Sequence, residues 1–250
     1  MSPKKIIPCL DVKDGKVVKG VNFVDMTDIG SPPQLAEEYC AQGADEITLL
    51  DITATLERRE TFFDLVSETA KRISVPLAVG GGMRSADEMS RILKAGADKV
   101  SINTAAVMNP GLIRESAERF GKERIIVAID AKKTRDSWDV VTHGGTKTIK
   151  LDAVEWARKV EDLGAGEILL TSVDADGVKN GYDIPLNKAV ADAVGIPVTA
   201  SGGCGKIEDF FEVLSQTNVS SALAASVFHY KQFTVKEVKQ YLKDRGVRVR

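Results

Sequence analysis

Two aspartates close short apolar runs that lie 119 positions apart in the chain. Asp11 ends the run IIPCLD, and Asp130 ends the run IIVAID. A single aspartate at such a place is often structural, because it caps a helix or pairs with a lysine. Two matched carboxyl groups that face one substrate are better suited to act as a general acid and a general base. We therefore expect acid/base catalysis by Asp11 and Asp130.

A glycine phrase also occurs twice. Residues 76–82 read PLAVGGG, and residues 197–203 read PVTASGG, 121 positions later. Glycine lets backbone N–H groups approach an anion closely, so each phrase is predicted to bind a phosphate, whereas a lone glycine pair would indicate only a tight turn. The expected phosphate ligands all lie just after apolar runs: Gly82, Asn103, Thr104, Asp176, Gly177, Ser201, Gly203, Ala225 and Ser226.

Two phosphate sites on either side of the aspartates imply a long, bis-phosphorylated substrate. The phosphate motifs of other folds are missing, since ASGGCGK lacks the first glycine of a Walker motif and no GxGxxG opens a helix. Lys19 lies in the glycine-bounded stretch GKVVKGVNF, which we expect to be a loop. Its ammonium group would either swing over a substrate phosphate or stay solvated, and the sequence favours neither.

The elements that must position these residues are eight apolar runs of strand character. They lie near residues 6–11, 46–51, 77–81, 99–103, 125–130, 167–172, 197–202 and 222–226. Amphipathic stretches of helical length separate most of them, for instance residues 31–43, 61–73, 151–164 and 234–246. This alternation predicts an α/β fold, a (βα)8 TIM barrel, whose active site would lie at the carboxyl ends of the strands.

The repeat fits two half-barrels of four βα units each. Pro76 precedes Pro197 by 121 positions, and Thr104 precedes Ser226 by 122. No linker or low-complexity segment interrupts the rhythm of strands and helices. We therefore expect one domain over residues 1–250, built from half-barrels of about 1–122 and 123–250.

Four charged residues stand at the starts of apolar runs, where apolar residues would serve stability better. We call them the four floor charges: Lys5, Glu46, Lys99 and Glu167. Charges at the floor of a barrel usually face solvent, and that interpretation has even weight. Their alternating signs also fit a closed ring of salt bridges that would plug or gate the barrel axis.

Composition excludes several classes of function. The 34 basic and 36 acidic residues nearly balance and form no long run of one sign, so no nucleic-acid partner is expected. Two histidines, and three cysteines without a CxxC pair, provide neither a metal cluster nor a disulfide framework. No apolar stretch is long enough for a membrane span or a signal peptide. We expect a cytoplasmic protein without metal or cofactor.

Collinear motifs along almost the whole chain resemble those of one enzyme family. They are CLDVKDGKVVKGVNF, DEITLLDITA, VGGGMRS, GADKVSINTAAV, VAIDAK, GAGEILLTSVDADG, GYD, SGGCG and ALAASVFHY. The family is the cyclase subunit of imidazole glycerol phosphate synthase, of histidine biosynthesis. The resemblance implies that a bis-phosphorylated ribulosyl formimino carboxamide ribonucleotide and ammonia are converted to imidazole glycerol phosphate and an aminoimidazole carboxamide ribonucleotide.

The resemblance also implies roles for residues and a partner. Asp11 and Asp130 match the acid/base pair of the family, and the four floor charges match the gate of an ammonia channel. The ammonia would come from a separate glutaminase subunit docked on the floor of the barrel. The family usually has arginine where this chain has Lys5, and lysine cannot form the bidentate pair of a guanidinium group.

Three other interpretations stay open at this point. The sibling phosphoribosyl isomerase of the same pathway shares the barrel, both phosphate sites and both aspartates, but has no use for a charged floor. A paralogous ammonia-using barrel of surface-polysaccharide synthesis would need a substrate assay to separate. A barrel kept only as a docking or activating partner would have no need of Asp11 and Asp130.

Overall fold

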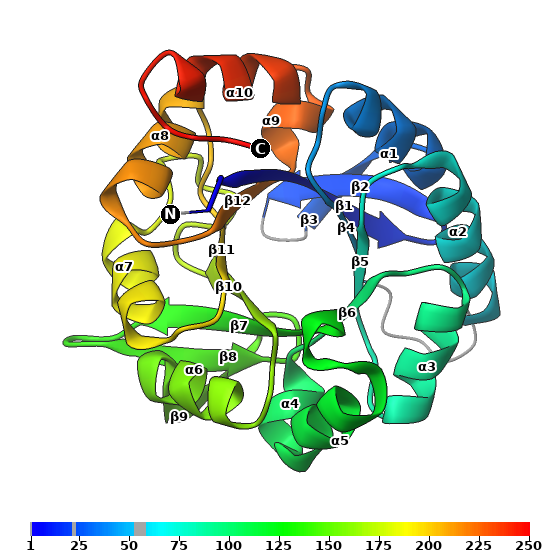
Figure 1. Ribbon diagram of the computed structural model, residues 1–250, viewed down its shortest axis with the longest axis vertical. Coiled ribbons are helices and arrows are strands. Elements are labelled where there is room, and N and C mark those ends of the chain that lie inside the picture. Colours follow the sequence, from blue (N-terminus) through cyan, green and yellow to red (C-terminus); the bar gives the residue numbers. More distant parts are fainter. Residues whose placement is uncertain (1, 22–23, 53–58) are drawn as a thin grey trace.

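The computed structural model describes residues 2–21, 24–52 and 59–250, with the backbone alone for 19–21, 24–28 and 59–61. Its eight parallel strands form a closed barrel (Figure 1). They are β1 (Lys5–Lys13), β4 (Ile47–Asp51), β5 (Leu77–Gly80), β6 (Lys99–Ile102), β7 (Ile125–Lys133), β10 (Glu167–Ser172), β11 (Val198–Ser201) and β12 (Ser221–Ala224). β10 pairs with both β11 and β7, which closes the ring. The predicted (βα)8 barrel is confirmed.

The helices surround the barrel on its outside (Figure 1). They are α1 (Pro32–Ala41), α2 (Arg59–Arg72), α3 (Ala86–Lys94), α4 (Thr104–Met108), α5 (Gly111–Phe120), α6 (Ala153–Asp162), α7 (Ile184–Ala193), α8 (Ile207–Gln216), α9 (Ser226–His229) and α10 (Val235–Lys243), with a 3-10 turn η2 (Lys122–Arg124). Local chemistry fixes where they begin. The carboxylate of Asp152, for example, accepts from the backbone N–H groups of Val154 and Glu155 at 2.9 Å each, which caps α6.

Two antiparallel hairpins extend the barrel and were not predicted. β2 (Lys16–Val21) and β3 (Val24–Gly30) follow β1, while β8 (Trp138–Thr142) and β9 (Lys147–Asp152) follow β7. The expectation that Lys19 lies in a loop was wrong, because its backbone belongs to β2. The turn before β2 is Asp14-Gly15, with φ angles of 54° and 78°, and this dipeptide favours a two-residue hairpin.

The ladders between neighbouring strands differ in length around the barrel. β7 and β10 pair over six residues, from Ile126 opposite Glu167 to Ala131 opposite Ser172. The ladder between β11 and β12 consists of two pairs, Thr199 with Ser221 and Ala200 with Ala222.

Alternation along each strand sends side chains to the inside or the outside of the barrel. On β1, Leu10 packs into the layer between strands and helices, whereas Ile7 and Cys9 pack inside the barrel. The same period places Lys5 at one end of the interior and Asp11 at the other, about 20 Å apart along the strand. The buried apolar residues between these ends are Ile7, Cys9, Ala78, Ile126, Leu169 and Leu223.

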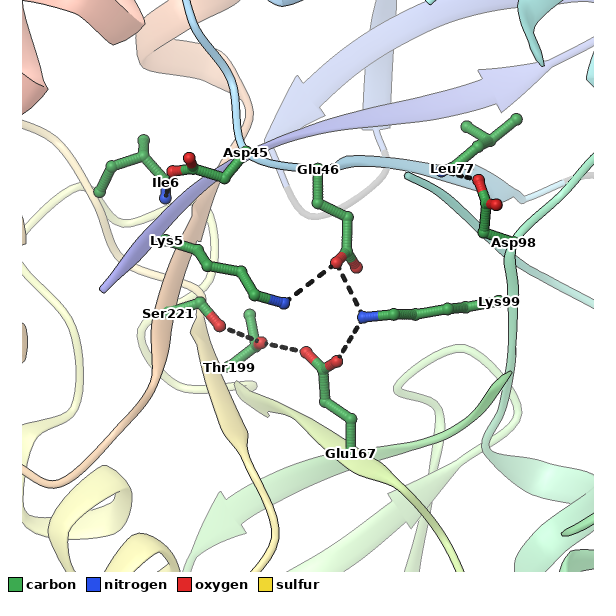
Figure 2. A network of polar contacts seen from close by, with 10 residues as sticks. All are labelled: Lys5, Ile6, Asp45, Glu46, Leu77, Asp98, Lys99, Glu167, Thr199 and Ser221. Carbon is green, nitrogen blue, oxygen red and sulfur yellow. Dashed lines mark hydrogen bonds and ion pairs between the residues drawn. The ribbon is translucent and has the colours of Figure 1, made fainter. Parts of the chain in front are cut away.

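Asp45 fastens the floor of the barrel to the outer layer. One carboxylate oxygen accepts from the backbone N–H of Ile6 at 2.8 Å, and the other lies 2.7 Å from the ammonium group of Lys239 on α10. Asp98 likewise accepts from the N–H of Leu77 at 2.9 Å, at the start of β5 (Figure 2). These carboxylates satisfy backbone donors that the strand ladder leaves open.

We predict that Asp45→Ala lowers the free energy of unfolding by about 3 kcal/mol, because it leaves a buried ammonium group and a backbone N–H without a partner. Asp87 provides a matched control, since it pairs with Arg119 at the same 2.7 Å but is 84% exposed, against 6% for Asp45. Asp87→Ala should cost less than about 1 kcal/mol. Urea unfolding of both variants measures the difference, and equal losses would contradict the role given to Asp45.

Candidate active site

Asp130 and Asn103 form the centre of the site at the carboxyl ends of the barrel strands. The amide Nδ2 of Asn103, at the end of β6, donates to Oδ2 of Asp130 on β7 at 2.8 Å. Burial of the carboxyl group and the nearby charge of Asp176 raise the pKa of Asp130 to about 7, although hydrogen bonds with Asn103 and Thr171 oppose the shift. Asp130 is therefore able to hold or release a proton near neutral pH.

Asp11 lies across the barrel mouth from Asp130. Its strand, β1, is separated from β7 by three barrel strands in either direction around the ring. The thiol of Cys9 lies 3.7 Å from Oδ1 of Asp11. The two aspartates thus approach the centre of the mouth from opposite walls, an arrangement in which one substrate between them meets both carboxyl groups.

Asp176, predicted to lie at the second phosphate site, also lies close enough to Asp130 to act on it. Its negative charge acts on Asp130, and its backbone N–H is engaged with the carbonyl oxygen of Ser172 at 3.0 Å. The backbone of Gly177, with φ of 75°, follows directly. Sequence reasoning missed the proximity of Asp176 to Asp130, because it depends on how the loop after β10 folds back.

The residues before α4 and α9, at the two predicted phosphate sites, have matching backbone angles. Asn103 before α4 has φ and ψ of −119° and −84°, and Ala225 before α9 has −122° and −76°. Both short helices begin with a hydroxyl residue, Thr104 or Ser226. Matching backbone angles before two short helices on opposite sides of the mouth fit a ligand that carries the same group at each end.

Besides letting an anion approach, glycine is required in the loops of Gly82 and Gly203 because the backbone there is closely packed or left-handed. A Cβ atom on Gly203, where φ is 101°, would lie 2.0 Å from the carbonyl oxygen of Gly181. Gly82 has φ of 59°, in the left-handed region, and Ser201 is buried at the end of β11. A substitution at Gly203 would therefore disturb the loop even before a ligand is considered.

One residue reaches the first loop unexpectedly. The backbone N–H of His143, in the turn between β8 and β9, donates to the hydroxyl oxygen of Thr104 at 2.9 Å. The His143 ring nitrogen Nδ1 lies 2.9 Å from the hydroxyl of Thr142. The hairpin thus supports one predicted phosphate ligand. The side chain of another, Lys19, lies outside the described part of the chain.

The four floor charges come together at the other end of the barrel (Figure 2). Lys5 lies 3.2 Å from Glu46, which precedes β4 by one residue, and Lys99 lies 2.8 Å from Glu46 and 2.7 Å from Glu167. Glu46 and Glu167 are buried, and the side chains of Lys5 and Lys99 are 23% and 16% exposed. The alternative of solvated floor charges does not fit this arrangement.

The predicted closed ring of salt bridges is corrected to an open chain. Among the described residues, no ion pair joins Lys5 to Glu167; instead, the hydroxyl of Thr199 donates to Glu167 at 2.7 Å (Figure 2). Burial by itself would lower the pKa of Lys99, but the charges of Glu167 and Glu46 raise it above its usual value. Burial would raise the pKa of Glu167, but the charges of Lys99 and Lys5, with hydrogen bonds from Lys99 and Thr199, lower it. Lys99 and Glu167 are therefore both charged at neutral pH.

The described residues contain no group of three or more histidines, cysteines or acids arranged to hold a metal ion. Within the same residues, no helix is long and apolar enough to cross a membrane.

Comparison with known proteins identifies relatives along the chain. Residues 5–234 match the model of the family described as "Histidine biosynthesis protein". The chain is 55% identical over 252 aligned residues to "Imidazole glycerol phosphate synthase subunit HisF" of Clostridium botulinum (strain Okra / Type B1), and the alignment covers 100% of both chains.

The raised pKa of Asp130 predicts a pH-dependent stability. Since this pKa is about 7 in the folded protein and about 3.8 in the unfolded chain, the stability contributed by the bound proton is present at low pH and is lost as pH rises toward about 7. Asp130→Asn removes the buried charge and keeps an oxygen that accepts from Asn103. Its advantage over the parent in free energy of unfolding should grow by about 3 kcal/mol between about pH 4 and pH 8.

Urea unfolding at both pH values measures this advantage. The exposed Asp136, in the turn after β7, supplies the control variant Asp136→Asn, whose difference from the parent should not change with pH. A constant difference for Asp130→Asn would mean that Asp130 titrates like an exposed carboxyl group.

Proposed function

The chain belongs to the histidine biosynthesis protein family, and from this premise we propose how its barrel works as the cyclase subunit of imidazole glycerol phosphate synthase. The substrate is a bis-phosphorylated ribulosyl formimino carboxamide ribonucleotide, which lies across the barrel mouth. The loops at Gly82 and Thr104 hold one phosphate, and those at Gly203 and Ser226 hold the other. The observation that supports this most directly is the placement of Asp11 and Asp130 on opposite walls between two loops of matching geometry.

The two aspartates divide the proton transfers of ring closure. Ammonia adds to the ketone carbon of the ribulosyl arm, whose oxygen takes up two protons and leaves as water. The new nitrogen then attacks the formimino carbon, which closes the ring. The bond from this carbon to the aminoimidazole carboxamide ribonucleotide breaks, and the leaving nitrogen takes up a proton. Asp130, with a pKa of about 7, supplies such protons as the general acid. Asp11 on the opposite wall removes protons from the attacking nitrogen as the general base. Asn103 orients the carboxyl group of Asp130 through its hydrogen bond.

Ammonia reaches the mouth from the floor. The Clostridium relative is named as a subunit, and we infer that the partner of this chain is a glutaminase subunit docked on the amino-terminal face of the barrel. Ammonia passes the four floor charges and then the buried apolar residues around Ile7 and Leu169. A dry passage favours neutral ammonia over ammonium, because a charged ion would lose its hydration there. We place the complex in the cytoplasm.

Asp11→Asn should lower kcat for ring closure by a factor of about 100 or more, with ammonium salt as nitrogen donor at alkaline pH, because a proton transfer is lost. The dissociation constant of the substrate should change little, since the phosphate loops are intact. Steady-state kinetics and a binding titration measure the two effects. Asp136→Asn, which removes a similar charge from an exposed turn, should leave both values unchanged. Equal losses in binding and turnover would exclude this role for Asp11.

Lys99→Ala should uncouple the two subunits. It leaves Glu46 and Glu167 buried with one cation fewer, which should lower the free energy of unfolding by about 3 kcal/mol and let water enter the floor. More glutamine should then be hydrolysed per imidazole formed, while turnover with ammonium salt changes little. The control Lys188→Ala removes an exposed ion pair with Asp192 at the same 2.7 Å. Parallel loss of both activities at an unchanged ratio would mean that the floor charges only stabilise the barrel.

A further inference from the structure

Two hydroxyl residues continue the floor network beyond the four floor charges. Thr199 on β11 and Ser221 on β12 are 2% and 0% exposed. The hydroxyl oxygen of Thr199 lies 2.7 Å from Oε1 of Glu167 and 2.7 Å from the hydroxyl oxygen of Ser221 (Figure 2). Lys99 approaches the other oxygen of Glu167, Oε2, at 2.7 Å. Glu167 is thus held at both oxygens, by a cation on one side and a hydroxyl on the other.

The direction of these hydrogen bonds follows from proton counting. Glu167 is ionised, because its pKa is lowered, so its carboxylate can only accept. The single hydroxyl proton of Thr199 is therefore committed to Glu167. Ser221 must then donate its own proton to the oxygen of Thr199. The result is a directed chain from Ser221 through Thr199 to Glu167.

These hydrogen bonds lie on the side of the floor between Glu167 and Lys5, which no ion pair among the described residues spans. Ser221 is the direct sheet neighbour of Thr199 on one side and of Lys5 on the other. The ion pairs run from Lys5 to Glu167, and from there the two hydroxyls lead to β12, the strand next to that of Lys5. Together with the four floor charges they extend the line of linked polar side chains from Lys5 to Ser221, the sheet neighbour of Lys5.

The internal repeat explains why hydroxyl residues lie on this side of the floor. Ser221 follows Lys99 by 122 positions, and Thr199 follows Ala78 by 121, the offsets of the half-barrel repeat. In the first half, the long side chain of Lys99 reaches Glu46 directly, and the buried Ala78 leaves room. In the second half, serine is too short to reach Glu167, and the hydroxyl of Thr199 fills the gap.

We infer that Thr199 and Ser221 are positioning residues of the ammonia gate: they hold Glu167 against Lys99 and seal the side of the floor that no ion pair closes. The inference rests on the proposed function. Without the Thr199 hydroxyl, Oε1 of the buried Glu167 lacks a donor, and its carboxylate is pulled toward Lys99, Lys5 or entering water. The floor would then no longer be closed when ammonia arrives from the partner.

The test uses Thr199→Val in the complex with its glutaminase subunit. A hydrogen bond to a charged group is worth a factor of about ten in a two-state equilibrium, so the ratio of glutamine hydrolysed to imidazole formed should rise by about two- to tenfold. Turnover with ammonium salt should fall less than turnover with glutamine. Thr199→Ser keeps the hydroxyl and should restore the parental ratio, which a purely steric role of the side chain would not produce.

Thr69→Val is the matched control. Thr69 is fully buried on α2, in the helix layer outside the barrel, and donates to the carbonyl oxygen of Leu65 at 2.8 Å. This variant should leave the ratio unchanged. Should Thr199→Val fail to fold, Ser221→Ala removes only the donor to Thr199 and should raise the ratio by a smaller factor.

An unchanged ratio in folded Thr199→Val or Ser221→Ala would overturn the inference, as would an equal rise in Thr69→Val or no restoration by Thr199→Ser. The proposed function is judged on the parental chain alone. If that chain makes no imidazole product from the ribulosyl substrate with ammonium salt, both fall; product formation with an unchanged ratio in the variants removes only the gate role of the two hydroxyls.

Discussion

The two-residue alternation of a β-strand is the constraint on which the rest of this barrel depends. Because the period is two, the residues that begin and end one inward-facing series on β1 are Lys5 and Asp11, with Ile7 and Cys9 between them. A shift of one residue would send every member of the series to the helix layer. The register of β1 thus places a charge at the floor, apolar side chains in the interior and Asp11 at the mouth, so none of these positions is able to change without the others.

Much of the fold and part of the site could be predicted from the sequence. Eight apolar runs with helical stretches between them determine a parallel barrel, and strand ends such as Asp11 and Asp130 then meet at one mouth. The hairpin after β1 was missed because the stretch GKVVKGVNF was expected to be a loop, although the dipeptide Asp14-Gly15 at its start is a hairpin signal. The charge of Asp176 beside Asp130 and the contact of His143 with Thr104 depend on how loops fold back, which no local pattern encodes.

The two halves of the barrel have similar backbones but different polar side chains. Asn103 and Ala225 share an unusual pair of backbone angles, yet only Asn103 has an amide that reaches Asp130. The floor shows the same division, with Lys99 in one half and Ser221 in the other. Under the proposed function, the repeated backbone would bind the two similar ends of the substrate in the same way, while the side chains that differ would orient the substrate. Chemistry that treats the two ends of a substrate differently needs that asymmetry.

The short ladder between β11 and β12 has a consequence for where the barrel opens locally. Local opening of a closed sheet starts where the fewest backbone bonds must separate, and two residue pairs join these strands, against six between β7 and β10. The first of those two pairs is Thr199 with Ser221. A hydrogen bond between their side chains therefore reinforces the shortest ladder of the barrel. Amide protons in this ladder would exchange with solvent sooner than those of β7. The floor network therefore includes the part of the barrel wall that opens most easily. Transient separation of β11 from β12 would first disturb the hydrogen bond from Thr199 to Glu167.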